Sequence, residues 1–254
     1  MLVIRSFIIA FGMYSKVPMP RVDWSKENMR YVMCFFPVIG AVIGGALYLW
    51  DYVSGVLDVS HVLYTVVIII LPLIITGGIH MDGFMDTTDA LRSYQPMEKK
   101  LDILKDPNSG AFAVISCVAY YLLTFGFWYD LNKELLPLLA IGFVLSRALS
   151  GLSVVTFPLA KNSGLVAMFS NEARKKVTAY VMLAYILVCI VLMTIINPIL
   201  STFCFFGLAI TYLYYYRMSK KEFGGITGDV AGYFLQLCEL VIVIFVVIGG
   251  KLCG

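Results

Sequence analysis

The chain has 254 residues, of which 60% are hydrophobic and only 14% are charged, and its mean hydropathy is +0.88. Soluble domains carry about 25% charged residues, so this composition excludes a soluble globular protein and indicates a polytopic membrane protein. The net charge of +3 is too small to indicate a nucleic-acid partner.

The hydropathy pattern predicts a helical membrane protein. The first fifteen residues are apolar but too short to span, and they lead into Lys16 and Pro18, so we expect a short interfacial helix there. Seven later runs are long enough to cross a bilayer, near residues 30–50, 61–79, 111–129, 134–157, 177–196, 198–216 and 231–250. We predict an all-α polytopic bundle of about seven transmembrane helices, forming one integral-membrane domain over residues 1–254.

The basic residues predict the orientation of the chain. Sixteen Lys and Arg residues lie in the N-terminal arm and in the loops after the second, fourth and sixth runs. The opposite side holds only Lys133 and Lys251, and Arg147 lies within a run. The positive-inside rule then predicts a cytoplasmic N-terminus and an external C-terminus. The polar motifs outside the apolar runs fall on the cytoplasmic side.

Small residues in the first run indicate a packing face. Gly40 and Gly44 have the GxxxG spacing that lets two helices approach closely. We interpret this face as a contact within the chain, and a contact between two copies in a homodimer is the alternative.

The segment 77–89, Gly-Gly-Ile-His-Met-Asp-Gly-Phe-Met-Asp-Thr-Thr-Asp, directly follows the second run. In a helix, Asp82, Asp86 and Asp89 lie at i, i+4 and i+7 and therefore share one face. Like charges on neighbouring turns repel, and ionised carboxylates beside hydrocarbon are costly, so we expect a bound divalent cation. Oxygen ligands favour Mg²⁺, and Mg²⁺ points to phosphate chemistry. We expect His80 and the three acids to be catalytic, with Asp82 and Asp86 as metal ligands.

His80 has three candidate roles: a base, a phosphate contact, or a hydrogen-bond donor to a carboxylate. A second polar patch, Lys105-Asp106-Pro107-Asn108-Ser109-Gly110, precedes the third run. By itself it is typical of a turn before a helix. Its position on the same side of the membrane predicts that Asp106 joins the metal ligands. Lys105 and the N–H groups from Gly110 onward are candidates for binding phosphate.

Two charged residues lie inside apolar runs. Arg147, in the fourth run, has two interpretations: a guanidinium that binds a pyrophosphate, or half of an ion pair with Glu239 in the seventh run. The loop 161–165 after the fourth run is either a cover for a substrate or a solvated loop.

The last motif, Gly224-Gly225-Ile226-Thr227-Gly228-Asp229, opens the seventh run. Its glycines permit close approach of an anion. We expect Gly225, Thr227 and Gly228 to bind phosphate, with Asp229 as a metal ligand; a simple glycine-rich turn is the alternative.

Together these motifs resemble the cobalamin synthase family, also called adenosylcobinamide-GDP ribazoletransferase. The family pattern GG-hydrophobic-H-hydrophobic-DG-x-x-DT-x-D is similar to residues 77–89, and its GGxTGD element is similar to residues 224–229, with Glu239 following. Ser146-Arg147 and the patch from Lys105 to Gly110 also resemble family elements, in the same order along the chain. The chain departs from the family at four positions without losing a carboxylate: Lys16, Ala90, Lys105 and Ala113.

The resemblance implies an enzyme of the last steps of cobalamin biosynthesis. The family joins adenosylcobinamide-GDP to α-ribazole, or to α-ribazole 5′-phosphate, and releases GMP. It is a Mg²⁺-dependent, multi-pass family of the bacterial plasma membrane, so the expected partners are these two small substrates and the lipid bilayer.

Two other hypotheses predict different sequence features. A phosphatidyl-type transferase pairs Asp-Gly with Ala-Arg and adds two acids at four-residue spacing, whereas this chain has Met85-Asp86-Thr87. A divalent-cation transporter places acids near the bilayer midplane. Here the aspartates gather at one side, which favours the transferase.

Overall fold

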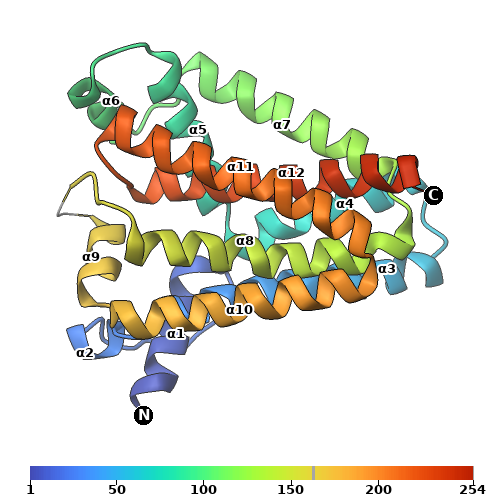
Figure 1. Ribbon diagram of the computed structural model, residues 1–254, viewed down its shortest axis with the longest axis horizontal. Coiled ribbons are helices and arrows are strands. Elements are labelled where there is room, and N and C mark those ends of the chain that lie inside the picture. The colour runs from blue at the N-terminus through green and yellow to red at the C-terminus, as the bar shows by residue number, and fades with distance from the viewer. Residues whose placement is uncertain (162–163, 254) are drawn as a thin grey trace.

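The computed structural model describes residues 1–161 and 164–253, which form a bundle of α-helices (Figure 1). The helices in chain order are α1 (Leu2–Tyr14), α2 (Lys26–Met29), α3 (Phe36–Val56), α4 (His61–Thr76), α5 (Ile79–Arg92), α6 (Met97–Ile103), α7 (Ala111–Tyr129), α8 (Leu136–Thr156), α9 (Leu165–Glu172), α10 (Lys175–Ile196), α11 (Pro198–Phe223) and α12 (Gly228–Cys253). Two 3₁₀ turns, η1 (Val32–Phe35) and η2 (Lys133–Leu135), lead into α3 and α8. Among the described residues there is no β-strand, only an isolated parallel bridge between Leu159 and Ile226.

The prediction of about seven membrane-crossing segments is confirmed, with one of them broken. Among the described residues, six helices are long and apolar enough to span alone: α3, α7, α8, α10, α11 and α12. The predicted run 61–79 becomes α4, which is followed by α5 after a bend of 93°. The polar helix α5 carries four charged side chains in its 14 residues, so it lies outside the six spanning helices.

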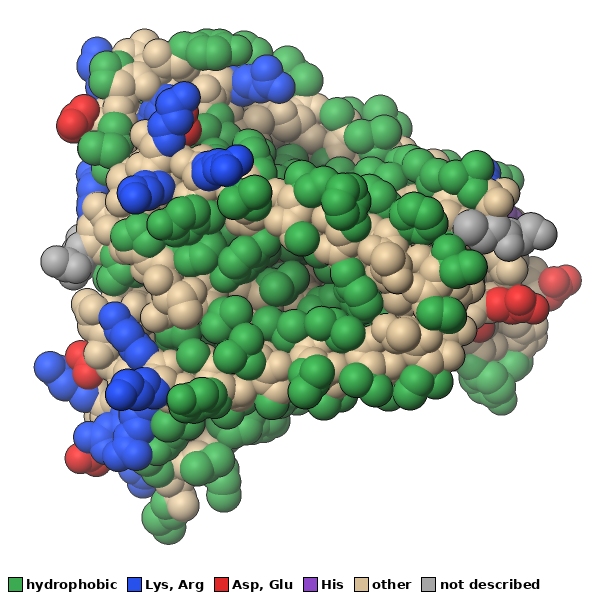
Figure 2. Space-filling model, in the orientation of Figure 1, with side chains coloured by type: hydrophobic (Ala, Val, Ile, Leu, Met, Phe, Trp, Pro, Cys, Tyr) green, Lys and Arg blue, Asp and Glu red, His purple; other side chains and the backbone are tan. Residues whose placement is uncertain are grey.

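The charged side chains gather where the sequence predicts them. Figure 2 shows Lys and Arg concentrated at one end of the molecule, while hydrophobic side chains cover its length. Figure 1 places α2, α6 and α9 at that same end. A belt of apolar side chains with basic residues at one end is the distribution that the positive-inside rule describes.

The centre of the bundle is α8, which packs against α3 and α10, while α12 packs against α5, α8 and α11. A methyl group at Gly40 would overlap the carbonyl of Phe143, and one at Gly44 would lie 3.1 Å from the carbonyl oxygen of Ala140. The GxxxG face of α3 therefore packs against α8 within the chain. This is the first of the two interpretations of Gly40 and Gly44.

Helix ends follow local capping chemistry. Asn197 separates α10 from α11, and its side chain accepts a hydrogen bond from the backbone N–H of Leu200 at 3.0 Å. The observed α11 continues to Phe223, beyond the predicted limit of 216, because the polar segment 217–222 stays helical. A hydropathy profile detects only the apolar part of such a helix.

Candidate active site

The bend between α4 and α5 is made by two glycines. Gly77 (φ +66°) and Gly78 (φ +80°) both have left-handed backbone conformations, which L side chains rarely adopt. The N–H of Gly78 still donates to the carbonyl of Leu73 at 3.1 Å. This turn lets an apolar helix end and a polar helix start in a new direction.

The residues of α5 divide between two faces. His80, Gly83, Thr87 and Ala90 are buried, whereas Asp82 is exposed and the next two aspartates are half-buried. The spacing of the three acids along one helix, predicted from the sequence, is therefore present in the fold.

The start of α12 joins this acidic face. A methyl group at Gly83 would lie 2.7 Å from the carbonyl oxygen of Asp229, so glycine is needed for the two helices to approach. Burial raises the pKa of Asp86 to about 6, together with the negative charges of its neighbours Asp82, Asp229 and Asp89. The two predicted motifs, 77–89 and 224–229, thus meet in space.

The donor set suits a hard cation. Among the described residues, no three His, Cys, Asp or Glu side chains converge into a complete metal site. Mg²⁺ is usually bound by one or two carboxylates and keeps water or phosphate oxygens as its other ligands. Carboxylate oxygens whose negative charges act on Asp86 fit an ion of this kind, and Asp82, Asp86 and Asp229 are the residues that would supply one or two of its ligands.

Asp89 instead holds the start of α7. Its carboxylate accepts a hydrogen bond from the N–H of Gly110, and a second from the N–H of Ala113 at 3.0 Å. These are the N–H groups at which the sequence predicts phosphate binding, so Asp89 occupies the position expected for an anion. Asp89 therefore connects α5 to α7 by accepting from backbone N–H groups at the start of α7, whose own N-cap residue is Gly110.

The other residues of the patch before α7 make local contacts. The Nζ of Lys105 pairs with Asp102 at 2.8 Å, and both groups are exposed. One oxygen of Asp106 accepts from the N–H and from the side-chain amide of Asn108, both at 2.9 Å. These contacts are those of the turn that the sequence allowed as the alternative.

The glycine turn before α12 is joined to the end of α8. Gly224 (φ +75°) ends α11, and Gly225 passes so close to Leu159 and Ala160 that a side chain there would meet backbone atoms. The N–H of Val230 donates to the Thr227 hydroxyl at 3.2 Å, so Thr227 caps the new helix. Gly228 remains exposed. In the loop 161–165, Asn162 and Ser163 lie outside the described residues.

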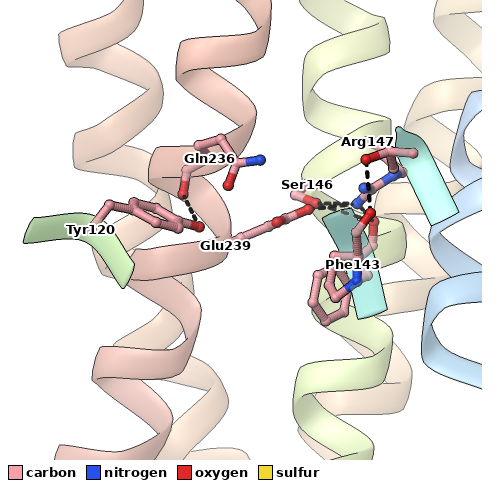
Figure 3. Close-up of polar contacts among 8 residues, drawn as sticks. Tyr120, Phe143, Ser146, Arg147, Gln236 and Glu239 are labelled. Carbon is pink, nitrogen blue, oxygen red and sulfur yellow. Dashed lines mark hydrogen bonds and ion pairs between the residues drawn. The ribbon is translucent and has the colours of Figure 1, made fainter. Parts of the chain in front are cut away.

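Arg147 and Glu239 form an ion pair in the middle of the bundle (Figure 3). The Nη1 of Arg147 donates to Glu239 Oε1 at 2.8 Å and to the carbonyl of Phe143 at 3.0 Å. This contact matches the structural interpretation of Arg147, while its Nε has no hydrogen-bond partner among the described residues.

His80 lies on the inner side of α5, away from the exposed face of Asp82. Its ring packs between Tyr14 and Phe36, and its Nε2 has no hydrogen-bond partner among the described residues. The pattern of charges along α5 does not reveal this burial, because position 80 precedes the first acid and its face depends on how α5 packs.

Lys16, marked in the sequence only as a departure from the family pattern, is a neighbour of the site. Its backbone N–H donates to the carbonyl of Ile75 at 2.7 Å, and its side chain lies across Gly77. Lys16 and Asp82 line the same groove. The only sequence signal was a basic residue directly before the segment Val17-Pro18-Met19-Pro20.

The chain is similar to known proteins over nearly its whole length. A family model described as cobalamin-5-phosphate synthase matches residues 6–247. A relative named adenosylcobinamide-GDP ribazoletransferase, from Lachnoclostridium phytofermentans, is 44% identical over 245 residues, covering 96% of this chain and 94% of the relative. A relative of the same name from Clostridium perfringens is 37% identical over 239 residues, covering 92% and 94%. No solved structure matches the chain.

Proposed function

The chain belongs to the cobalamin-5-phosphate synthase family, and we propose that it works with Mg²⁺ held by Asp82, Asp86 and Asp229. The reaction transfers the adenosylcobinamide-phosphate group of adenosylcobinamide-GDP to α-ribazole or α-ribazole 5′-phosphate, with release of GMP. It belongs to the last steps of cobalamin biosynthesis. The matches favour this transferase over the phosphatidyl-type transferase and the cation transporter.

The observation that carries the metal proposal is the contact between α5 and α12. Asp229 reaches the acids of α5 only because Gly83 lets the backbone of α12 approach. Burial and the neighbouring carboxylates Asp82, Asp229 and Asp89 raise the pKa of Asp86, which shows that these negative charges act on one another. Mg²⁺ held by Asp82, Asp86 and Asp229 would supply the compensating positive charge that phosphoryl transfer from a pyrophosphate needs.

The chemistry then requires a displacement at phosphorus. A ribose hydroxyl of the acceptor attacks the cobinamide-linked phosphorus, a new P–O bond forms, and the P–O bond to GMP breaks with its electron pair leaving on GMP. The hydroxyl proton passes to a carboxylate of the cluster. We prefer a carboxylate to His80 as the acceptor because His80 is enclosed by Tyr14 and Phe36.

Phosphate contacts come from the exposed edge of the site. Gly228 leaves an open approach beside Asp229, since a methyl group there would meet only Val166, at 3.9 Å. We propose that the pyrophosphate approaches the cluster over this glycine. The end of the molecule rich in Lys and Arg (Figure 2) supports a cytoplasmic location for this face and for the N-terminus.

The test compares Asp82→Asn and Asp86→Asn with Asp58→Asn, a matched change of an exposed acid in the turn between α3 and α4. GMP release is measured on purified proteins with and without Mg²⁺. We expect the first two variants to lose about 10²–10³-fold in kcat, because each removes a group that organises charge at the reacting phosphate. Asp58→Asn should match the wild type. Near-normal turnover in both site variants, or full activity in EDTA, would reject the proposed metal ligands.

A further inference from the structure

A continuous trough runs from Asp82 along the chain that follows α1. One groove, of about 590 Å³, lies between the end of α1 and the α4–α5 turn and is lined by Lys16 and Asp82. A second, of about 530 Å³, follows residues 17–24. The two grooves share Gly12, Ser15 and Lys16, so we treat them as one surface, the arm trough.

Two cations line the arm trough. Lys16 lies at the junction of the two grooves and Arg21 lies further along, and both are exposed. Within the described residues, neither forms an ion pair with a carboxylate. The backbone hydrogen bond from Lys16 to Ile75 and the contact of its side chain with Gly77 keep this cation beside α5. Unpaired cations next to a phosphoryl-transfer site indicate an anionic ligand.

Apart from Lys16, Arg21 and the Ser15 hydroxyl, the side chains that line the second groove are apolar or aromatic. Val17, Met19 and Val22 contribute to its walls, and Trp24, whose surface is 45% exposed, also lines it. None of the described residues that line this groove carries a carboxylate or an amide side chain. A guanine base would find no carboxylate or amide side chain there for its N–H donors, and a buried donor left unpaired is costly. A benzimidazole base has no such donors and suits apolar walls and a tryptophan face.

We infer that the arm trough binds the phosphorylated acceptor, α-ribazole 5′-phosphate, with Lys16 and Arg21 on its phosphate and Trp24 against its base. This inference rests on the proposed function, since it assigns a place to the second substrate of that reaction. Because Lys16 and Asp82 line the same groove, a phosphate on Lys16 holds the acceptor in the trough that reaches the carboxylate cluster.

The kinetic test uses the full chain in lipid nanodiscs and three substrates: α-ribazole 5′-phosphate, α-ribazole and adenosylcobinamide-GDP. We expect Lys16→Met to raise KM for α-ribazole 5′-phosphate about 10- to 100-fold, as for the loss of one charge-assisted hydrogen bond. KM for unphosphorylated α-ribazole should stay unchanged. Lys16→Arg should restore most of the affinity. Lys26→Met is the control, because the exposed Lys26 at the start of α2 lines neither groove and its Nζ lies 3.6 Å from Glu172.

The outcomes separate the two proposals. An inactive wild type would overturn the proposed function itself. An active wild type whose Lys16→Met variant loses affinity equally for both acceptors, or only for adenosylcobinamide-GDP, would overturn the acceptor site.

A binding measurement adds a readout that needs no turnover. The chain has three tryptophans, and among them Trp128 is buried and Trp50 donates its indole N–H to the carbonyl of Tyr64 at 3.0 Å. Addition of α-ribazole 5′-phosphate should therefore change the fluorescence of Trp24, and Trp24→Phe should abolish the change. A signal that persists in Trp24→Phe would contradict the stacking assignment.

Discussion

Neutralising Glu239 alone should destabilise the protein far more than removing the whole Arg147–Glu239 pair. The Arg147 side chain is 1% exposed, that of Glu239 is 9% exposed, and the atoms Nη1 and Oε1 are 2.8 Å apart. With an effective dielectric constant of about 20, this separation corresponds to an attraction of about 6 kcal/mol. Glu239→Gln removes that attraction and leaves a buried guanidinium without its counter-charge. We expect the free energy of unfolding to fall by about 3–5 kcal/mol.

The double variant Arg147→Met/Glu239→Leu should behave differently. It removes both charges and fills the space with apolar side chains, and such replacements of buried pairs are often neutral or stabilise by about 1–4 kcal/mol. The double variant should therefore be much more stable than Glu239→Gln. The two variants should differ because burying one charge without a partner lowers the free energy of unfolding more than burying an ion pair does.

The assay is equilibrium unfolding of the purified chain in one detergent, followed by circular dichroism. Asp130→Asn is the matched control, because it breaks the Lys251–Asp130 pair, whose side chains are 57% and 49% exposed. An exposed pair contributes at most about 1 kcal/mol. Unchanged stability in Glu239→Gln would refute the reasoning, as would a double variant less stable than Glu239→Gln. A stable double variant with a raised KM for adenosylcobinamide-GDP would show that Arg147 also binds substrate.

Two further predictions concern packing and capping. Gly40→Ala should destabilise the protein by about 1–3 kcal/mol, because its methyl group would overlap the Phe143 carbonyl. Gly45→Ala, with no atom within 4 Å, should not destabilise it, and equal thermal stabilities of the two variants would contradict this packing. Asp89→Ala should lower the free energy of unfolding by about 0.5–2 kcal/mol, because the N–H groups at the start of α7 lose their acceptor. The Mg²⁺ requirement in the GMP-release assay should be unchanged. A raised Mg²⁺ requirement would instead make Asp89 a metal ligand.

The sequence alone was enough to predict the membrane-crossing helices and the spacing of Asp82, Asp86 and Asp89. Apolar run length and helical period are local quantities, and they depend little on what a segment packs against. The grouping of Lys and Arg on one side of the membrane could be predicted from the sequence for the same reason. The family resemblance could be recognised because its motifs are short and occur in order.

Only the tertiary structure decided which of these residues meet. Asp229 lies 147 positions after Asp82, and its place beside α5 depends on the 93° bend at Gly77 and on close packing at Gly83. The same packing directs Asp89 to the start of α7, Arg147 to Glu239, and His80 into an aromatic enclosure. Motif spacing cannot specify these contacts, because distances between helices follow from the shapes of the packed side chains and not from separation along the chain.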